Sequence, residues 1–247
     1  MPQAPIKVIS LVRTPERRAL FARNNPDLAY AFFDAVDGST LTPADITASG
    51  LFQPGLNYRL GAYGITLSHY RLWQEAAAGD TPLTVAEDDA VFRADFTDRQ
   101  AELLATLPDG WDYVAWGFNF DSVLTMRLPF GMPAIMSFSR NHVAGVLQNF
   151  RSGTTPCNLC RLEVCFGLPA YTISPGGARR FLKELFPLRN YSRTFPLLPK
   201  PMANEGIDMA MNQLYAGGGC HVSFPPLVAT PNDIAASTIQ NSSYHKA

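Results

Sequence analysis

The sequence has few cysteines, no long apolar run and no excess of charge of either sign. Its four cysteines are too few for a disulfide-built scaffold in a chain of 247 residues. No apolar stretch approaches the roughly 20 residues of a membrane-spanning helix. Lysine and arginine together number 20 against 21 acidic residues, so we expect no basic surface for a nucleic-acid backbone. These absences disfavour disulfide-rich, transmembrane and nucleic-acid-binding classes.

Apolar residues, by contrast, are plentiful. They make up 47% of the chain and charged residues 17%, which is the composition of a folded protein rather than a disordered one. The length suits one large domain with a substantial core. The first residues lack the apolar core of a secretory signal peptide. We therefore expect a cytoplasmic protein, either free or docked peripherally on the inner face of the membrane.

Short apolar runs alternate with segments of helical periodicity along most of the sequence. Helix starts are indicated where a hydroxyl residue precedes Pro, as at Thr14 and Ser174. This alternation is typical of an α/β fold with a mostly parallel sheet flanked by helices. No linker or repeat interrupts residues 1–247, so we predict a single domain. The expected strands cover residues 6–11, 30–36, 81–86, 112–116, 170–173 and 221–224.

The periodic pattern fades between residues 118 and 168, where Pro, Gly, Phe and Met are scattered and only a weak helix is indicated, around residues 142–150. A long segment of this kind usually carries function, and we expect a lid over a ligand site. Its aromatic residues, Phe130 among them, could stack on a ligand ring or serve as ordinary core anchors. The polar tail, residues 231–247, is expected to wrap around the domain or to fray.

Three adjacent acids, Glu87, Asp88 and Asp89, directly follow one of the apolar runs. A buried strand that leads into a polar loop places side chains at the carboxyl edge of a sheet, where open α/β folds bind ligands. Crowded carboxylates repel one another unless a cation neutralises them, and Mg²⁺ or Mn²⁺ prefers such oxygen ligands. The triplet therefore predicts a divalent metal site that could bridge a diphosphate. A solvated acidic turn is the alternative.

Cysteine and histidine offer a second candidate metal site. Cys157-x-x-Cys160 with Cys165 could bind zinc, with Cys220 or His221 as the fourth ligand, although structural zinc sites usually contain two paired half-sites. Unliganded reduced thiols are the alternative. His221 stands at the start of the last expected strand, and it could instead complete the shell of a metal held by the acidic triplet.

Seven short segments form an ordered set along the chain: 8–18, 32–38, 64–69, 86–90, 171–174, 225–228 and 237–239. In this order they resemble the bacterial lipooligosaccharide glycosyltransferases of family 25, a group that includes β-galactosyltransferases. The resemblance covers most of the chain. The sequence departs from the family pattern at Ala62 and Ile65, where the family usually has Glu and Cys.

The resemblance implies a GT-A-like fold and an inverting transfer of a sugar, most often galactose from UDP-galactose, onto a saccharide of lipopolysaccharide or a related cell-surface glycan. It implies that Glu87 and Asp89 hold Mn²⁺ or Mg²⁺ against the diphosphate, while Asp88 contacts the ribose or the metal. The stretch 118–168 would then be an acceptor-side lid. The departures leave open a catalytically inactive module that binds nucleotide sugars or glycans. A metal-dependent hydrolase is a third reading.

An inverting transfer needs a base that takes the proton of the acceptor hydroxyl. Asp208 stands in the first turn of a helix predicted at 206–215, where the helix dipole keeps a carboxylate ionised. The family has a similar Asp near this point. We therefore expect Asp208 to be the base, with Glu205 as its substitute. The alternative is that Asp208 only stabilises the helix.

Basic residues that follow the first expected strand could bind the donor. Arg13, Arg17 and Arg18 could reach its phosphates or its uridine, because arginine pairs well with such groups. A solvated helix face is an equally good interpretation.

A turn and a helix supply further candidates for the donor site. Asp37 and Gly38 could hold the ribose or the base edge, or form a plain turn. Ser68 and His69 lie in the apolar helix predicted at 62–78. The family resemblance favours a ligand role for this pair, whereas a lone histidine at such a position is otherwise more often a core residue.

Overall fold

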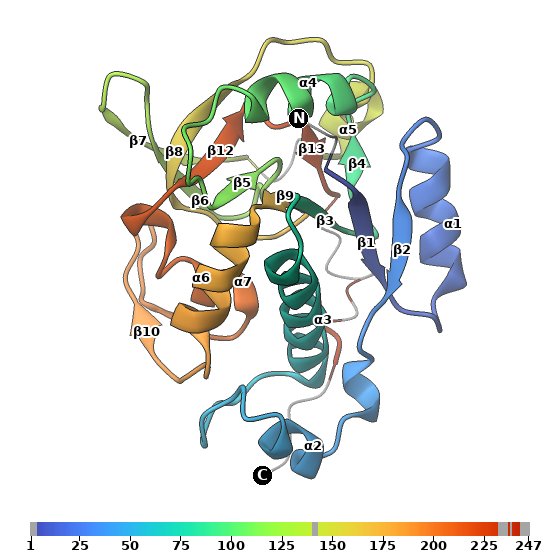
Figure 1. The fold of residues 1–247 in the computed structure, drawn as a ribbon, viewed down its shortest axis with the longest axis vertical. Coiled ribbons are helices and arrows are strands. Elements are labelled where there is room, and N and C mark those ends of the chain that lie inside the picture. Colours follow the sequence, from blue (N-terminus) through green and yellow to red (C-terminus); the bar gives the residue numbers. More distant parts are fainter. Residues whose placement is uncertain (1–3, 140–142, 232–236, 238, 243–247) are drawn as a thin grey trace.

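The computed structural model of the protein describes residues 4–139, 143–231, 237 and 239–242 (Figure 1). Its strands are β1 (Ile6–Ser10), β2 (Ala31–Asp34), β3 (Leu83–Glu87), β4 (Val91–Phe92), β5 (Tyr113–Ala115), β6 (Val123–Arg127), β7 (Pro133–Ser137), β8 (Asn158–Val164), β9 (Ala170–Ile173), β10 (Ser192–Arg193), β11 (Met202–Ala203), β12 (Cys220–Phe224) and β13 (Val228–Ala229). Its helices are α1 (Pro15–Asn24), α2 (Pro43–Ala48), α3 (Leu60–Ala78), α4 (Phe96–Leu104), α5 (Val143–Phe150), α6 (Pro175–Leu185) and α7 (Ile207–Met211), with 3₁₀ turns η1 (Gly38–Thr40) and η3 (Tyr215–Gly217).

A nine-stranded sheet forms the centre of the described chain, in the order β2-β1-β3-β9-β5-β12-β8-β6-β7. Strands β1, β2, β3, β5, β12 and β6 run in one direction, and β9, β8 and β7 run in the other. The predicted α/β class, a large sheet flanked by helices, is confirmed. The sheet is mixed because β9 and β8 are each inserted between strands of the opposite direction.

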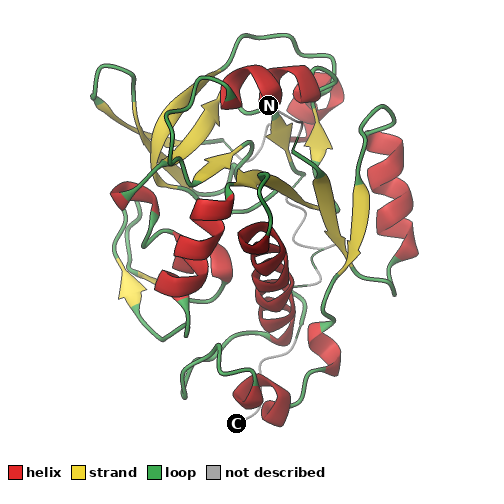
Figure 2. Cartoon of the chain, viewed as in Figure 1, coloured by secondary structure: helices red, strands yellow, loops and turns green. Residues whose placement is uncertain are grey.

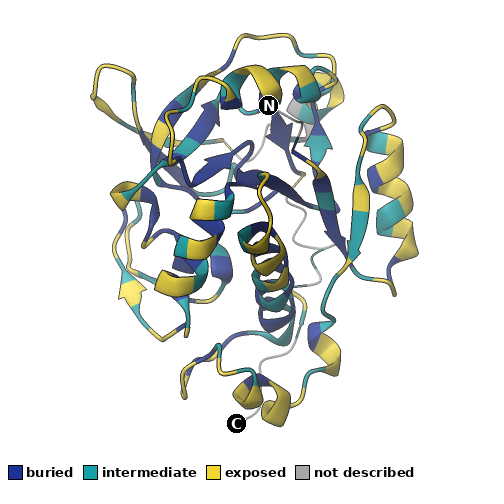
Figure 3. Ribbon diagram, viewed as in Figure 1, coloured by how far each residue is buried: buried dark blue, intermediate teal, exposed yellow. Residues whose placement is uncertain are grey.

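Helices cover both faces of this sheet (Figures 1 and 2). Along β5 the side chains alternate, so that Tyr113 and Ala115 join the core under α3, α6 and α7, whereas Val114 joins the core under α1 and α4. The central strands β3, β5 and β9 are buried, the edge strands β2 and β7 are partly exposed, and the outward faces of the helices are exposed (Figure 3). Because both faces of the sheet are covered, all four residues of β9 are buried rather than every second one.

Two of the helix starts follow the expected capping chemistry. The Ser174 hydroxyl accepts a hydrogen bond from the Gly177 backbone N–H at the start of α6. Thr42 and Asp45 form a reciprocal capping box at the start of α2. Thr14 does not cap α1, because its hydroxyl donates to the Leu11 carbonyl of the preceding turn.

The stretch 118–168, expected to be irregular, contains β6, β7, α5 and β8, and three of the nine sheet strands come from it. In β8 the buried residues Cys160, Leu162 and Val164 recur at every second position, which is the period of a strand with one face in the core. Scattered Pro and Gly lie between these strands and mask the period. The hairpin of β6 and β7 projects from the edge of the sheet (Figure 2).

Within the part of the chain that the structure describes, no helix is both long and apolar enough to cross a membrane. Of the polar tail 231–247, residues 232–236, 238 and 243–247 lie outside the described residues. The remaining tail residues return to the start of α3, where the Ser242 hydroxyl accepts a hydrogen bond from the Gly61 backbone N–H at 2.9 Å. The segment 237–239 carries part of the family resemblance. Its middle residue, 238, lies outside the residues that the structure describes.

Candidate functional site

The acidic triplet lies where β3 ends, beside the carboxyl ends of the parallel strands β1 and β2. Its middle member, Asp88, is buried and fully engaged. The Ser10 hydroxyl donates to Asp88 Oδ2 at 2.7 Å, and Arg17 Nε on α1 donates to Asp88 Oδ1 at 2.8 Å. Both carboxylate oxygens of Asp88 are therefore occupied by neighbours from the chain, and its charge is neutralised by Arg17.

Glu87 and Asp89 flank this ion pair and are differently placed. The Thr230 hydroxyl donates a hydrogen bond to Asp89, whose Oδ1 atom is buried without a hydrogen-bond partner. Burial, the charge of Asp89 and the charge of Asp208 raise the pKa of Glu87 to about 8. Burial likewise raises the pKa of Asp89, against the opposing effect of Arg17. The two carboxyls thus form an electrostatically strained pair, which a cation would relieve.

Asp208 belongs to the same cluster, although more than a hundred residues separate it from Glu87 in the sequence. Its Oδ2 accepts a hydrogen bond from the Gly167 backbone N–H at 3.1 Å, and its Oδ1 accepts one from the Met209 backbone N–H at 2.8 Å. These two bonds fix the orientation of the carboxylate at the start of α7. Burial raises the pKa of Asp208 above its ordinary value, with a further contribution from the Asp121 charge.

Two adjoining cavities open at this cluster. The small cavity, about 90 Å³, lies at the ends of β1 and β2 and is lined by Arg13, Asp37, Gly38 and Asp88 among others. The acidic cavity, about 380 Å³, is lined among others by Asp89, Asn119, Asp121, Glu205 and Asp208. Four side chains line both cavities, namely Arg17, Ile65, Glu87 and Ile239. A ligand that extends from the small cavity into the acidic one would therefore pass between Arg17 and Glu87.

The turn after β2 supplies one wall of the small cavity. Asp37 accepts a hydrogen bond from Arg13 Nε at 2.5 Å and another from the Ser39 backbone N–H at 3.0 Å. Burial works against the charge of Asp37, but these bonds lower its pKa below the ordinary value. Gly38 packs directly on the start of α3, because a Cβ atom there would lie 1.9 Å from the Leu60 carbonyl oxygen.

Other predicted donor-binding residues lie away from both cavities. Arg18 donates to the Ser10 carbonyl and to Asp34, and stacks over the Phe32 ring. Ser68 is buried, accepts a hydrogen bond from the Val36 backbone N–H and donates to the Gly64 carbonyl. These two side chains hold α1 and α3 against β1 and β2, which is a structural role.

His69 is a core residue as well. It is fully buried, its Nδ1 lies 2.8 Å from the Tyr171 hydroxyl, and burial lowers its pKa to about 3. A histidine that stays neutral inside the core under α3 is not positioned to bind a ligand in either cavity. The more common interpretation of a lone histidine in an apolar helix therefore fits this residue.

His221 does not join the acidic triplet. It lies on β12, which is separated from β3 by β9 and β5, or about 14 Å across the sheet. Its Nδ1 is 3.2 Å from the Gly219 carbonyl oxygen, and burial lowers its pKa. The expectation that His221 completes the metal shell is therefore corrected by the strand order.

The four cysteines are likewise not arranged as metal ligands. Cys157, Cys160, Cys165 and Cys220 are free and buried. Burial raises the thiol pKa of Cys160 and of Cys165, which opposes the thiolate form that zinc requires. In the described part of the chain, no group of three or more His, Cys, Asp or Glu side chains is arranged to hold a metal ion. Reduced core thiols are the interpretation that fits.

Sequence reasoning missed several residues around the acidic cavity. Asn119, Asp121 and Thr230 line it, although no motif singled them out. Asn212 links the turn after β8 to α7, because its amide donates to the Cys165 carbonyl at 2.7 Å and to the Asp208 carbonyl at 2.9 Å. Only the polar character of Asn212 within an apolar helical segment could have indicated this bridge.

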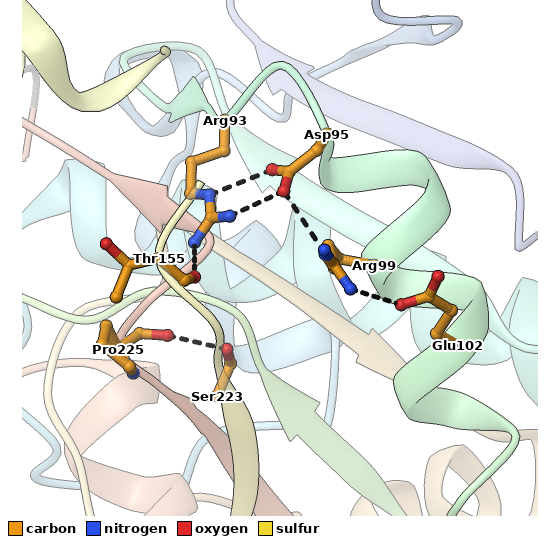
Figure 4. Close-up of polar contacts among 7 residues, drawn as sticks. All are labelled: Arg93, Asp95, Arg99, Glu102, Thr155, Ser223 and Pro225. Carbon is orange, nitrogen blue, oxygen red and sulfur yellow. Dashed lines mark hydrogen bonds and ion pairs between the residues drawn. The ribbon is translucent and has the colours of Figure 1, made fainter. Parts of the chain in front are cut away.

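A buried ion pair supports the strand that leads to Thr230. Arg93, which directly follows β4, donates to Asp95 and to the Thr155 carbonyl (Figure 4). Its side chain is only 3% exposed. Because β4 pairs with β13, and Thr230 directly follows β13, this anchor helps to hold the Thr230 hydroxyl beside Asp89.

Replacing Gly167 by Ala should lower the free energy of unfolding by about 2–3 kcal/mol. Gly167 has a φ of +77°, and a Cβ atom there would lie 2.1 Å from Asn119 Oδ1. The matched control is Gly110→Ala, since Gly110 has a φ of +80° with nothing within 4 Å of an added Cβ. That variant should lose only about 1 kcal/mol. Equal losses in urea unfolding would show that the contact with Asn119 does not matter.

Replacing Glu87 by Gln should stabilise the ligand-free protein, increasingly so as the pH rises. The ordinary pKa of this carboxyl is 4.5 and its pKa in the fold is about 8. Between these values the unfolded chain releases a proton that the folded protein keeps, so the stability contributed by Glu87 declines with pH in this window. Since the side chain is partly open to solvent, we expect a gain of roughly 1–2 kcal/mol at pH 8.

Thermal unfolding of wild type and Glu87→Gln at pH 5 and pH 8 measures this effect. The difference in Tm should be small at pH 5 and reach several degrees at pH 8, since about 1 kcal/mol corresponds to about 2–4 °C in a chain of this size. A difference that does not depend on pH would contradict the raised pKa of Glu87.

Much of this sequence is similar to known proteins. The sequence profile of glycosyltransferase family 25 (LPS biosynthesis protein) matches residues 3–195. A protein of Acanthamoeba polyphaga mimivirus, named as a glycosyltransferase, is 36% identical over 136 residues, which are 51% of this chain and 42% of that protein. A glycosyltransferase 25 family member of Aedes aegypti is 34% identical over 125 residues, which are 45% of this chain and 21% of that protein.

A relative that matches nearly the whole chain carries a different name. The Rattus norvegicus protein "probable inactive glycosyltransferase 25 family member 3" is 27% identical over 248 residues, which are 94% of this chain and 38% of that protein. The chain spans less than half the length of each of these relatives.

Proposed function

The chain belongs to glycosyltransferase family 25, and from this premise we propose that it is an inverting, metal-dependent transferase. The expected donor is a UDP-hexose, UDP-galactose first among them, and the expected acceptor is a saccharide of lipopolysaccharide or a related cell-surface glycan. One observation carries the proposal. The small cavity, which would hold the nucleoside of the donor, and the acidic cavity, which contains Asp208, meet at Arg17 and Glu87. The diphosphate of the donor would lie at this junction.

The small cavity suits the nucleoside end of the donor. Arg13 and Asp37 offer a donor and an acceptor at its wall, and the carboxyl ends of β1 and β2 are where open α/β sheets bind nucleotides. A GT-A-like arrangement would place the nucleotide at this edge. The diphosphate would then extend towards Arg17, whose guanidinium already balances Asp88 and lies 3.9 Å from Asp89.

Glu87 and Asp89 are the residues that would hold a divalent metal ion. Hard cations such as Mn²⁺ or Mg²⁺ are commonly bound by one or two carboxylates together with substrate phosphates. The fit rests on the buried Asp89 Oδ1, which lacks a hydrogen-bond partner, and on the crowding that raises the pKa of Glu87. We assign no metal contact to Asp88, because Ser10 and Arg17 already donate hydrogen bonds to its two oxygens. When bound, the metal would neutralise charge on the departing diphosphate.

Asp208 is the proposed general base. In the transfer, the acceptor oxygen forms a bond to the anomeric carbon while the bond from that carbon to the diphosphate oxygen breaks, and attack from the opposite face inverts the configuration. Asp208 takes the proton of the acceptor hydroxyl. The backbone N–H groups of Gly167 and Met209 keep its carboxylate oriented, and burial brings its pKa closer to the working pH of a base.

The proposal is tested by measuring UDP release from UDP-galactose with Mn²⁺ and a panel of saccharide acceptors. Transferase activity requires release that increases when an acceptor is added, whereas a hydrolase would be indifferent to the acceptor. The second candidate is a binding module without catalysis, which the name of the rat relative favours. Donor binding by calorimetry without turnover of UDP-, GDP- or CMP-sugars would select this second candidate.

A further inference from the structure

The acidic cavity has one wall that its proposed role as a sugar site leaves unexplained. The side chains of Ala62, Ile65, Leu168, Ile207 and Ile239 line this cavity and all belong to one hydrophobic cluster. Ala62, Leu168 and Ile207 are buried members of that cluster, and Ile65 and Ile239 pack against it. The wall is contributed by the start of α3, the turn before β9, the start of α7 and the returning tail. These five apolar side chains therefore come together at one cavity from four separate segments of the chain.

This apolar wall lies where the hexose of the donor would be placed. Ile65 and Ile239 line both cavities, as Arg17 and Glu87 do, so a diphosphate near Arg17 puts the attached sugar next to these two side chains. The acids Glu87, Asp89 and Asp208 line the same cavity. For a hexose in this space, the carboxylates offer partners to its hydroxyls, whereas the five apolar side chains of the wall offer none.

A hydroxyl group turned towards that wall would lose its hydrogen bonds to water without replacement, which disfavours binding. A methyl group there would instead leave water for an apolar contact, which favours binding. Asn119 and Gln240 line the same cavity, and their carboxamides could pair with an amide linkage. A wall of this kind therefore fits a hexose in which a methyl-bearing group, an acetamido group above all, replaces a hydroxyl.

We propose that the donor sugar carries a methyl-bearing substituent that rests on the wall formed by Ala62, Ile65, Leu168, Ile207 and Ile239, and that the substrate is a UDP-N-acetylhexosamine rather than the unsubstituted UDP-hexose. This inference rests on the proposed transferase function and replaces UDP-galactose, its first expected donor, by an acetamido sugar. Ile65 is the specificity-determining residue, because it lies at the junction of the two cavities and only partly within the core.

The experiment compares UDP-galactose, UDP-N-acetylgalactosamine and the 6-deoxy derivative of UDP-galactose. We measure kcat/KM for UDP release and Kd by calorimetry, both with Mn²⁺. A methyl group in an apolar pocket discriminates by about 10–200-fold, so the acetamido donor should exceed UDP-galactose by at least about tenfold. A preference for the 6-deoxy donor over both others would support recognition of the methyl group and overturn the acetamido assignment.

Ile65→Val and Ile65→Thr form a matched pair of nearly equal shape that differ by a methyl and a hydroxyl. The Thr variant should reduce the preference for the acetamido donor by about tenfold relative to the Val variant. Equal or better use of UDP-galactose by the wild type would overturn the inference while leaving the transferase proposal intact. If no donor binds or turns over, the proposed function itself fails. The wild-type comparison decides the matter even if a variant does not fold.

Discussion

Replacing Asp208 by Asn should lower kcat by about a thousandfold while the donor Kd changes by less than about threefold. The amide cannot take the proton of the acceptor hydroxyl, and Asp208 has no proposed contact with the nucleotide. Stability should change little, since an Asn oxygen can still accept the hydrogen bond from the Met209 backbone N–H. The bond from the Gly167 N–H to the second oxygen would be lost, at a cost of about 1 kcal/mol.

Glu205→Gln is the matched control for this variant. Glu205 lines the same cavity and precedes α7 by two positions, but its side chain is exposed, and the hydrogen bonds described for Asp208 do not involve it. Its kcat should stay within about threefold of the wild type. The reverse result, a loss in Glu205→Gln with activity retained in Asp208→Asn, would transfer the role of base to Glu205.

The acid limb of the pH profile gives an independent readout of the base. As the pH rises through the pKa of Asp208, the carboxylate forms and kcat/KM increases. Because burial raises this pKa, the limb should lie above the ordinary value of 3.8. The residual activity of Asp208→Asn should lack the contribution of Asp208 and keep only that of Glu87, whose pKa in the ligand-free fold is about 8. A merely structural role for Asp208 would lower the rate without removing this dependence on pH.

The elements that the sequence predicted well are those whose signal is local. Strand β9 coincides with the predicted run 170–173, and the Ser174 cap is present as expected, because both depend on a few consecutive residues. The placement of Glu87 at the end of β3 follows from the apolar run before it. Strand β8 was missed although Cys160, Leu162 and Val164 alternate, since polar and turn residues on either side obscured the period.

The assembly of the site depends on contacts that no local pattern encodes. Arg17 and Arg18 are adjacent, but successive residues on a helix point about 100° apart, so Arg17 reaches Asp88 while Arg18 turns to Asp34. His221 looked like a metal ligand until the strand order placed β9 and β5 between it and the acids. Thr230 reaches Asp89 only through the pairing of β13 with β4. Such relations follow from topology rather than from spacing.

Replacing Asp89 by Ala should reduce kcat/KM by about 10²–10³-fold and remove the effect of Mn²⁺ on donor affinity. The proposed metal site has only Glu87 and Asp89 as protein ligands, so one lost carboxylate leaves a single anchor. The buried Oδ1 of Asp89, which has no hydrogen-bond partner, disappears together with the side chain. The ligand-free protein should therefore not be destabilised by more than about 1 kcal/mol, because the lost Thr230 hydrogen bond is offset by relief of the crowding around Glu87.

Asp112→Ala is the control for this prediction, because Asp112 forms an ion pair with Arg180 and neither residue lines either cavity. It should lower stability, since the Arg180 guanidinium would lose an ionic partner, yet the Mn²⁺ titration of donor binding should keep its midpoint. Calorimetry of UDP binding at several Mn²⁺ concentrations separates the two outcomes. Unchanged Mn²⁺-dependent binding and turnover in Asp89→Ala would rule out the metal assignment, and Arg17 would then be the remaining candidate for neutralising the diphosphate.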